Sequence, residues 1–153
     1  YEYLYADNSY IYRREDTSQG NDIFYIHMTD EIQGAPWIKR FMAVGETFVS
    51  TKQVRNMWNN CTERLPKAAV VDSIKLIKIH DSYTFSKTGK TLNNVAELQW
   101  LEGGETYFFA LGLGLVGFKD ANVDAQFAGQ LFGRTPLQYA VPTCVNDTEK
   151  YYA

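Results

Sequence analysis

Three oxygen-bearing side chains alternate along the segment 120–124, which reads Asp-Ala-Asn-Val-Asp. A loop with this spacing can wrap oxygen ligands around calcium. An EF-hand would continue with glycine at the next position and glutamate at the twelfth, whereas this chain has alanine and leucine there. Two interpretations stay open: a calcium site at Asp120, Asn122 and Asp124, or a polar turn whose side chains bond their own backbone.

The two histidines of the chain, His27 and His80, each have acidic residues close by in the sequence. Two imidazoles and a carboxylate can form a metal or acid–base site if the strands that carry them are adjacent. The alternative is two exposed strand histidines without a catalytic role. The chain has no Gly-x-Ser-x-Gly elbow to support a Ser–His–Asp nucleophile.

The glycines of the segment 112–117, Gly-Leu-Gly-Leu-Val-Gly, match the G-x-G-x-x-G dinucleotide pattern. That pattern binds phosphate because a helix begins at the glycines and directs its amides at the pyrophosphate. Residues 118–122 predict no such helix, so we interpret the glycines as hairpin residues and expect no cofactor.

Cys61 and Cys144 are the two cysteines of the chain, too few for a structural zinc site. We expect a disulfide between them, which for so long a loop would stabilise the fold by about 4.5 kcal/mol in the chain-entropy model. Two reduced thiols in a cytosolic core are the alternative. Asn-x-Thr sequons at Asn60 and Asn146 predict N-glycosylation if the source is eukaryotic.

Tyrosines gather near the start of the chain. Alternating tyrosines on a strand form an aromatic face that can stack on sugar rings or pack against another subunit. Tyrosine also suits half-buried strands without any ligand. Candidate ligand or subunit contacts are therefore Tyr1, Tyr3, Tyr5, Tyr10 and Tyr12, with core cover as the alternative.

The elements that must position these residues are expected to be strands. Short runs of aromatic and β-branched residues predict strands over 10–14, 23–28, 37–44, 74–80 and 94–101. In the last run, Ala96, Leu98 and Trp100 alternate with Glu97 and Gln99, which predicts one solvent-exposed face. Two segments compete for helix: we favour a strand over 51–59 and leave 123–132 open.

A C-terminal meander is the clearest local pattern. The Gly-Gly pair at 103–104 predicts a two-residue hairpin turn between strands 95–101 and 106–111. Gly112 and Gly114 predict a second reversal or a bulge before a strand at 115–119.

Composition limits the class of protein. With 153 residues and 45% hydrophobic residues, the chain suits one soluble globular domain covering 1–153. The net charge of −3 gives no basic excess for nucleic-acid binding. The longest apolar stretch, 107–118, is shorter than the about 20 residues that a transmembrane helix needs. Because Tyr1 is no initiator Met, we interpret it as a processed N-terminus, with an excised fragment as the alternative.

The segment 105–118, Glu-Thr-Tyr-Phe-Phe-Ala-Leu-Gly-Leu-Gly-Leu-Val-Gly-Phe, resembles a hairpin of secreted bacterial β-rich proteins that include lipoprotein-carrier-like half-barrels. The resemblance covers a small part of the chain and carries no functional residue. It implies a curved antiparallel sheet in an exported protein, with an apolar concave face.

We therefore expect an all-β fold: a single antiparallel domain, as a curved sheet, half-barrel or sandwich, with a C-terminal meander and at most one or two short helices. The first function hypothesis is a secreted, non-enzymatic binding module for a glycan or a lipid-like ligand. The second is a subunit of a cell-surface layer or filament that self-assembles through its Tyr-rich strand. The third is a hydrolase that uses His, Asp and Glu side chains.

Overall fold

The fold is built from antiparallel strands. The computed structural model describes residues 2–16, 23–29, 32–58, 60 and 62–129. The regular elements in this part of the chain are all strands: β1 (Glu2–Ala6), β2 (Tyr10–Asp16), β3 (Ile23–Thr29), β4 (Ile32–Gln33), β5 (Ala35–Lys39), β6 (Thr47–Trp58), β7 (Glu63–Thr84), β8 (Thr91–Trp100), β9 (Thr106–Ala110), β10 (Gly114–Lys119) and β11 (Asp124–Gln126). The all-β, antiparallel prediction is confirmed.

Hydrogen bonds join the strands in the order β1-β2-β3-β6-β7-β8-β9-β10-β11, while β4 pairs with β3 and β5 pairs with β2. The last five strands of this path follow chain order and are linked by hairpins. They form the C-terminal meander that the glycines at 103–104 and 112–114 predict.

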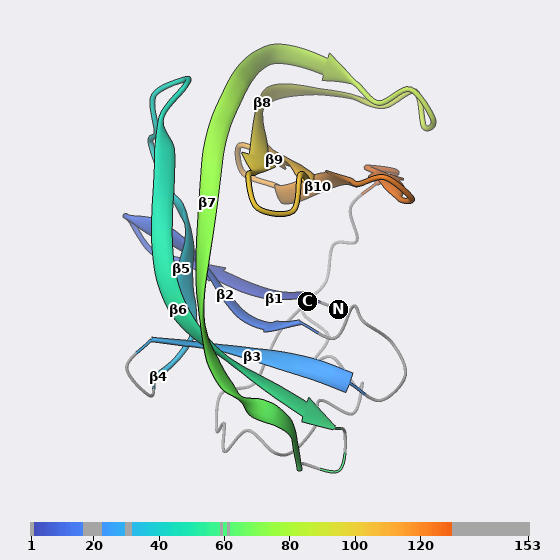
Figure 1. Cartoon of the computed structure of the whole chain (residues 1–153). Helices are drawn as coiled ribbons and strands as arrows, with labels where there is room; N and C mark the ends of the chain where they lie inside the picture. Colours follow the sequence, from blue (N-terminus) through green and yellow to red (C-terminus); the bar gives the residue numbers. More distant parts are fainter. Residues whose placement is uncertain (1, 17–22, 30–31, 59, 61, 130–153) are drawn as a thin grey trace.

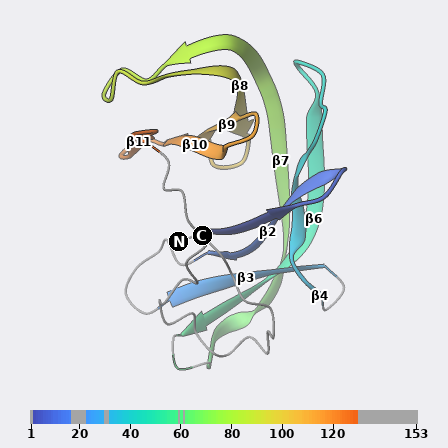
Figure 2. The same ribbon diagram turned by 180° about the vertical axis from the view of Figure 1, so that it is seen from behind.

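Strand β7 connects the two halves of the molecule, which are the N-terminal strands β1–β6 and the C-terminal strands β8–β11. It has 22 residues, and its first part pairs with β6 while its second part pairs with β8. The register with β8 shifts between Leu76 and Lys78, and such a bulge bends a strand. Figures 1 and 2 show β7 as an arc that carries β8–β11 over β1 and β2. The run 74–80 predicted only part of the second half of this strand.

A central core lies between the two halves. Trp37 of β5 meets Tyr107 of β9 edge to face, with ring centroids 4.7 Å apart. Such pairs add about 0.5–1.5 kcal/mol beyond the burial of their surface. The buried members of this core come from β5, the turn after it, and β7–β9: Trp37, Ile38, Met42, Ile74, Leu76, Leu98 and Tyr107.

A second core covers the opposite face of β8 and β9. It contains Phe85, Val95, Phe108, Ala110 and Val116. The sequence predicted that the Glu97 face of β8 would be exposed to solvent, but Val95 on that face is 0% exposed. That prediction is wrong near Val95, because β10 and the end of β7 supply apolar cover that the alternation within β8 could not reveal.

The β8–β9 turn differs in detail from its prediction. The Trp100 amide donates to the Glu105 carbonyl (2.8 Å), so four residues form the loop rather than two. Only Gly104 of the glycine pair has a positive φ, 74°. Gly103 instead lies against the Trp100 ring, since a Cβ added to Gly103 would stand 2.0 Å from that ring.

Three other predicted segments can be compared with the structure. The strand favoured over 51–59 is confirmed over 51–58 as part of β6, and residue 59 lies outside the described residues. The strand predicted over 37–44 ends at Lys39, because a turn begins at Arg40 and Phe41 adopts a left-handed conformation (φ 57°) within it. The open segment 123–132 contributes the short strand β11, and its residues after 129 lie outside the described residues.

Candidate functional site: an apolar groove

An open groove of about 550 Å³ lies between the two halves of the molecule. One wall comes from β1, β2, β5 and the turn after β5, and the other comes from β7–β10. Figures 1 and 2 show β8–β10 facing β1 and β2, with β7 running along both groups of strands. The groove therefore exists because the bend in β7 places the C-terminal meander over the N-terminal strands.

The walls of the groove are mainly apolar. Ile38, Leu76 and Leu98 reach it from the central core, and Phe109 extends the same surface. Other apolar lining residues are Ala6, Ile11, Met42, Ile79, Ala96, Ala110 and Leu111. A concave apolar surface with a few polar groups is the usual form of a small-molecule site.

Phe41 lines the groove and exposes 86% of its surface. Its φ of 57° lies in the left-handed region, where a non-glycine residue costs roughly 1–2 kcal/mol. The Arg40 guanidinium stands 5.1 Å from the centre of the Phe41 ring. A large apolar ring is thus kept in solvent on a strained backbone, and strain of this kind is concentrated at functional sites.

Two cations line the groove. Arg40 donates to the Asp7 carbonyl at 2.5 Å, which attaches the turn after β5 to the β1–β2 turn. Lys39 pairs with Glu46 at 2.5 Å, and this contact raises the pKa of Lys39 and lowers that of Glu46. Lys39 and Arg40 thus place two cationic side chains at this part of the groove, each of them beside an acidic residue, Glu46 and Asp7 respectively.

Of the tyrosine candidates, Tyr10 and Tyr12 do not lie flat beside each other. Tyr10 and Tyr12 are half-buried on β2 and meet edge to face, with ring planes 75° apart. Tyr10 also packs 5.5 Å from Phe48, and the Tyr12 hydroxyl donates to Asp7. Tyr3 and Tyr5 belong to β1, whereas Tyr1 lies outside the described residues.

The two histidines lie far apart. His27 on β3 is opposite Val54 of β6, which is opposite Ala68 of β7. His80 lies 12 residues further along β7, roughly 40 Å along the strand at 3.3 Å per residue. His80 instead contacts Glu97 of β8 at 2.8 Å. A joint His27–His80 site is therefore incompatible with the topology.

His27 belongs to a buried polar cluster. Lys52 and Asp72 form an ion pair there, with side chains only 2% and 4% exposed. Burial lowers the pKa of His27 well below its usual value, and the charges of Lys52 and Arg13 act in the same direction. His27 is thus neutral at physiological pH and belongs to the structural interior rather than to the groove.

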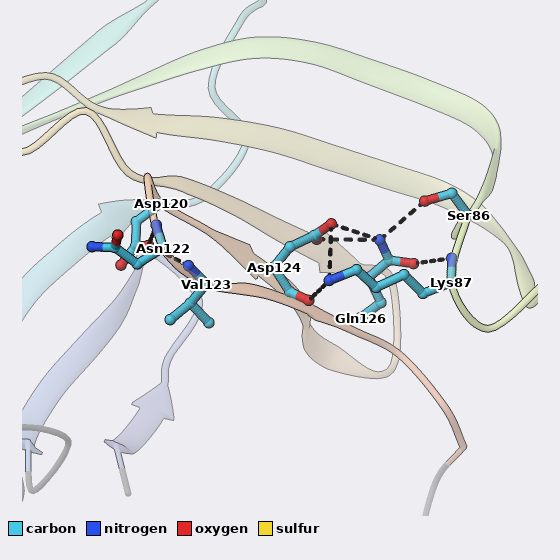
Figure 3. Close-up of polar contacts among 7 residues, drawn as sticks. All are labelled: Ser86, Lys87, Asp120, Asn122, Val123, Asp124 and Gln126. Atoms are coloured by element: carbon cyan, nitrogen blue, oxygen red, sulfur yellow. Dashed lines mark hydrogen bonds and ion pairs between the residues drawn. The ribbon is translucent and has the colours of Figure 1, made fainter.

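The calcium candidates have separate hydrogen-bond partners. Asp120 accepts the backbone amides of Asn122 and Val123, both at 2.6 Å, which is the pattern of a polar turn. Asp124 points the other way, toward Gln126, and pairs with Lys87 at 3.4 Å (Figure 3). Within residues 2–129, as far as they are described, no three His, Cys, Asp or Glu side chains are grouped to hold a metal.

Several predictions concern the other candidate residues. Cys61, Cys144 and Asn146 lie outside the described residues, so the disulfide and the second sequon stay predictions. Asn60 is exposed between β6 and β7, and its side-chain oxygen accepts the Thr62 hydroxyl at 2.6 Å.

The described strands and turns include no helix with the length and hydrophobicity of a transmembrane span.

Neither the groove nor Phe41 stands out in the sequence. The residues of the groove come from two separate parts of the chain, 6–42 and 76–114, and each is an ordinary strand or turn residue in its own segment. The only local signal was the apolar concave face implied by the resemblance of 105–118, which includes Phe109 and Leu111. Comparisons of the chain with protein-family models, curated proteins and solved structures found no match.

Proposed function

We propose that this chain is a non-enzymatic extracellular binding module whose apolar groove holds a lipid-like ligand with an anionic end. The observation that carries the proposal is Phe41, which has a strained backbone and exposes 86% of its surface at an apolar groove of about 550 Å³. That volume lies within the range of about 300–1,000 Å³ typical of ligand pockets.

The composition of the lining selects the ligand class. An acyl chain would cover the exposed side chains of Ile79 and Leu111 and remove Phe41 from water. Burying a phenylalanine side chain contributes about 1.5–3 kcal/mol. Lys39 and Arg40 can donate hydrogen bonds to a carboxylate or phosphate at the end of the chain. An uncharged chain end lacks these charge-assisted hydrogen bonds.

Two further considerations support an extracellular location within the proposal. The Cys61–Cys144 disulfide expected from the sequence would persist in an oxidising compartment. The segment 105–118 resembles a hairpin of secreted bacterial β-rich proteins that include lipoprotein-carrier-like half-barrels, and this resemblance implies an exported protein with an apolar concave face. Its strands β9 and β10 contribute Phe109 and Gly114 to the groove.

A fluorescence titration with cis-parinaric acid tests the binding proposal. This probe has an acyl chain and a carboxylate, and its emission rises in an apolar environment. We expect a saturable increase with the intact chain. The Leu111→Ser variant removes an exposed side chain of the groove and should weaken binding by about tenfold.

The matched control is Leu101→Ser, which removes an exposed leucine in the β8–β9 loop, away from the groove lining. It should leave the affinity unchanged. An emission change that does not saturate, or an equal loss of affinity in both variants, would contradict the proposal.

One observation favours the assembly hypothesis as a second candidate. β1 is the first strand in the sheet order, and its pairing among the described residues is with β2 on one side. An edge strand of this kind can add a strand from another chain. Light scattering over a range of protein concentrations discriminates, because assembly through β1 requires a mass that rises with concentration.

A further inference from the structure

A second pocket, of about 310 Å³, opens on the opposite face of β8 and β9 from the apolar groove. Glu97 and Phe108 line this pocket, whereas Ala96 and Phe109, their neighbours in the two strands, line the groove. Successive side chains of a strand point to opposite faces, so the two sites share strands without sharing these side chains.

The floor of the pocket is aromatic. Phe85 and Phe108 are buried there with ring centroids 6.2 Å apart, and the half-buried Tyr83 stacks 5.0 Å from Phe108. Phe85 and Phe108 also belong to the second core. The core therefore holds the floor in a fixed position.

The rim is polar and fixed by hydrogen bonds between distant segments. Figure 3 shows Gln126 of β11 reaching the hairpin that joins β7 and β8. Its side-chain oxygen accepts the Lys87 amide at 2.7 Å, and its side-chain nitrogen donates to Ser86 at 3.2 Å. The Thr88 hydroxyl donates to the Phe127 carbonyl at 2.7 Å. These contacts hold one side of the pocket closed.

Hydrogen-bond acceptors and donors alternate around the opening. Glu97 and Asp124 provide carboxylate acceptors, and Lys119 and Thr106 provide donors. His80 bonds Glu97 at 2.8 Å and fixes that carboxylate from behind. Lys87 and Lys119 offset the negative charge of the two carboxylates. The rim is therefore rich in polar groups but close to electrically balanced.

We propose that this pocket binds a neutral sugar unit. Sugar hydroxyls both donate and accept hydrogen bonds, as the mixed rim requires, and the apolar face of a sugar ring can pack on the half-buried Tyr83 ring, which Phe85 and Phe108 support from below. The volume is at the lower end of the range for ligand pockets, which suits one small unit. This inference is independent of the lipid groove, because it uses the other face of β8 and β9.

Asp124 is suited to accepting a hydrogen bond from a sugar rather than to donating a proton to a leaving group. Glycoside hydrolysis needs one protonated carboxyl group to donate to the leaving oxygen. The Gln126 amide and the Lys87 ammonium hold the pKa of Asp124 below its usual value. Asp124 is thus an acceptor for a hydroxyl group and not a proton donor at neutral pH.

The test is an amide-resolved NMR titration of the intact chain with glucose, mannose and N-acetylglucosamine, each as a separate probe. We expect at least one sugar to shift the amides of Ser86, Glu97 and Gln126 in a saturable way. Glu97→Gln keeps the shape and removes the charge, and it should weaken that sugar at least about tenfold. Glu63→Gln changes an exposed glutamate far along β7 and should have no effect.

Each other outcome counts against the inference. It is overturned if none of the three sugars produces saturable shifts, if the shifts lie elsewhere, or if Glu97→Gln binds like the parent chain. Release of nitrophenol from nitrophenyl glycosides would also overturn it, because the pocket would then hydrolyse a sugar and not merely bind one. Binding of cis-parinaric acid by Glu97→Gln serves as the folding control and reports on the groove alone, so the two proposals fail separately.

Discussion

Replacing Phe41 with glycine should weaken ligand binding while leaving the free energy of unfolding almost unchanged. Glycine relieves the left-handed backbone, a gain of roughly 1–2 kcal/mol. Against this stand about 0.5–1 kcal/mol for the flexibility of glycine in the unfolded chain and about 0.5–1 kcal/mol for the lost Arg40–Phe41 contact. These contributions nearly cancel. The free energy of unfolding should therefore stay within about 1 kcal/mol of the parent chain.

Ligand binding should respond much more strongly than stability to the same change. Because 86% of the Phe41 surface is exposed in the free protein, nearly all of it is available to a ligand. Losing about 1.5–2.5 kcal/mol of burial weakens an acyl ligand by at least about tenfold. Phe41→Ala should lose the same affinity but keep the backbone strain, so it should be less stable than Phe41→Gly.

Two measurements check this reasoning: urea unfolding followed by tryptophan fluorescence, and titration with cis-parinaric acid. Parent-like affinity in Phe41→Gly would refute a role for the ring in binding. A loss of stability above about 2 kcal/mol in Phe41→Gly would show that the ring stabilises the fold, contrary to its exposure.

Three further predictions concern the interior and the hairpin. The pKa of His27 is lower in the folded chain than in the unfolded one, so the unfolded chain takes up the proton first as the pH falls below about 6.5. The free energy of unfolding should therefore drop by at most about 1.4 kcal/mol per pH unit. Unfolding curves of His27→Phe should lack this dependence between pH 7 and 5, whereas a parallel decline in both proteins would count against it. Lys52→Met should lower the free energy of unfolding in urea by about 3–5 kcal/mol, because it leaves Asp72 buried and unpaired. The double variant Lys52→Met with Asp72→Leu should recover most of that loss, and a double variant as unstable as Lys52→Met alone would contradict the pairing. Gly103→Ala should lower thermal stability by about 1–3 kcal/mol through its clash with the Trp100 ring, and an unchanged melting temperature would contradict that contact.

Much of the fold could be predicted because its signals are local. The strand β3 and the hairpins of the meander follow from alternation and from glycines within a few residues of each other. The polar turn that begins at Asp120 is equally local, and it was one of the two interpretations of that segment.

The groove could not be predicted because it depends on contacts between distant segments. Phe41 lies in a run that reads as a strand, and nothing in that run indicates its left-handed conformation. The length and bend of β7 depend on two different partner strands. Likewise, Val95 is buried by side chains of other strands, which the alternation of β8 does not reveal.

The most direct test of the lipid-binding groove is a methyl-resolved NMR titration of the intact chain with decanoic acid. The central claim predicts saturable shifts at the methyl groups of Ile38, Leu76 and Leu98, which line the groove. The methyl groups of Val49 and Val71, exposed on β6 and β7 away from the groove, should stay unchanged. Shifts confined to Val49 and Val71, or none that saturate, would contradict the claim.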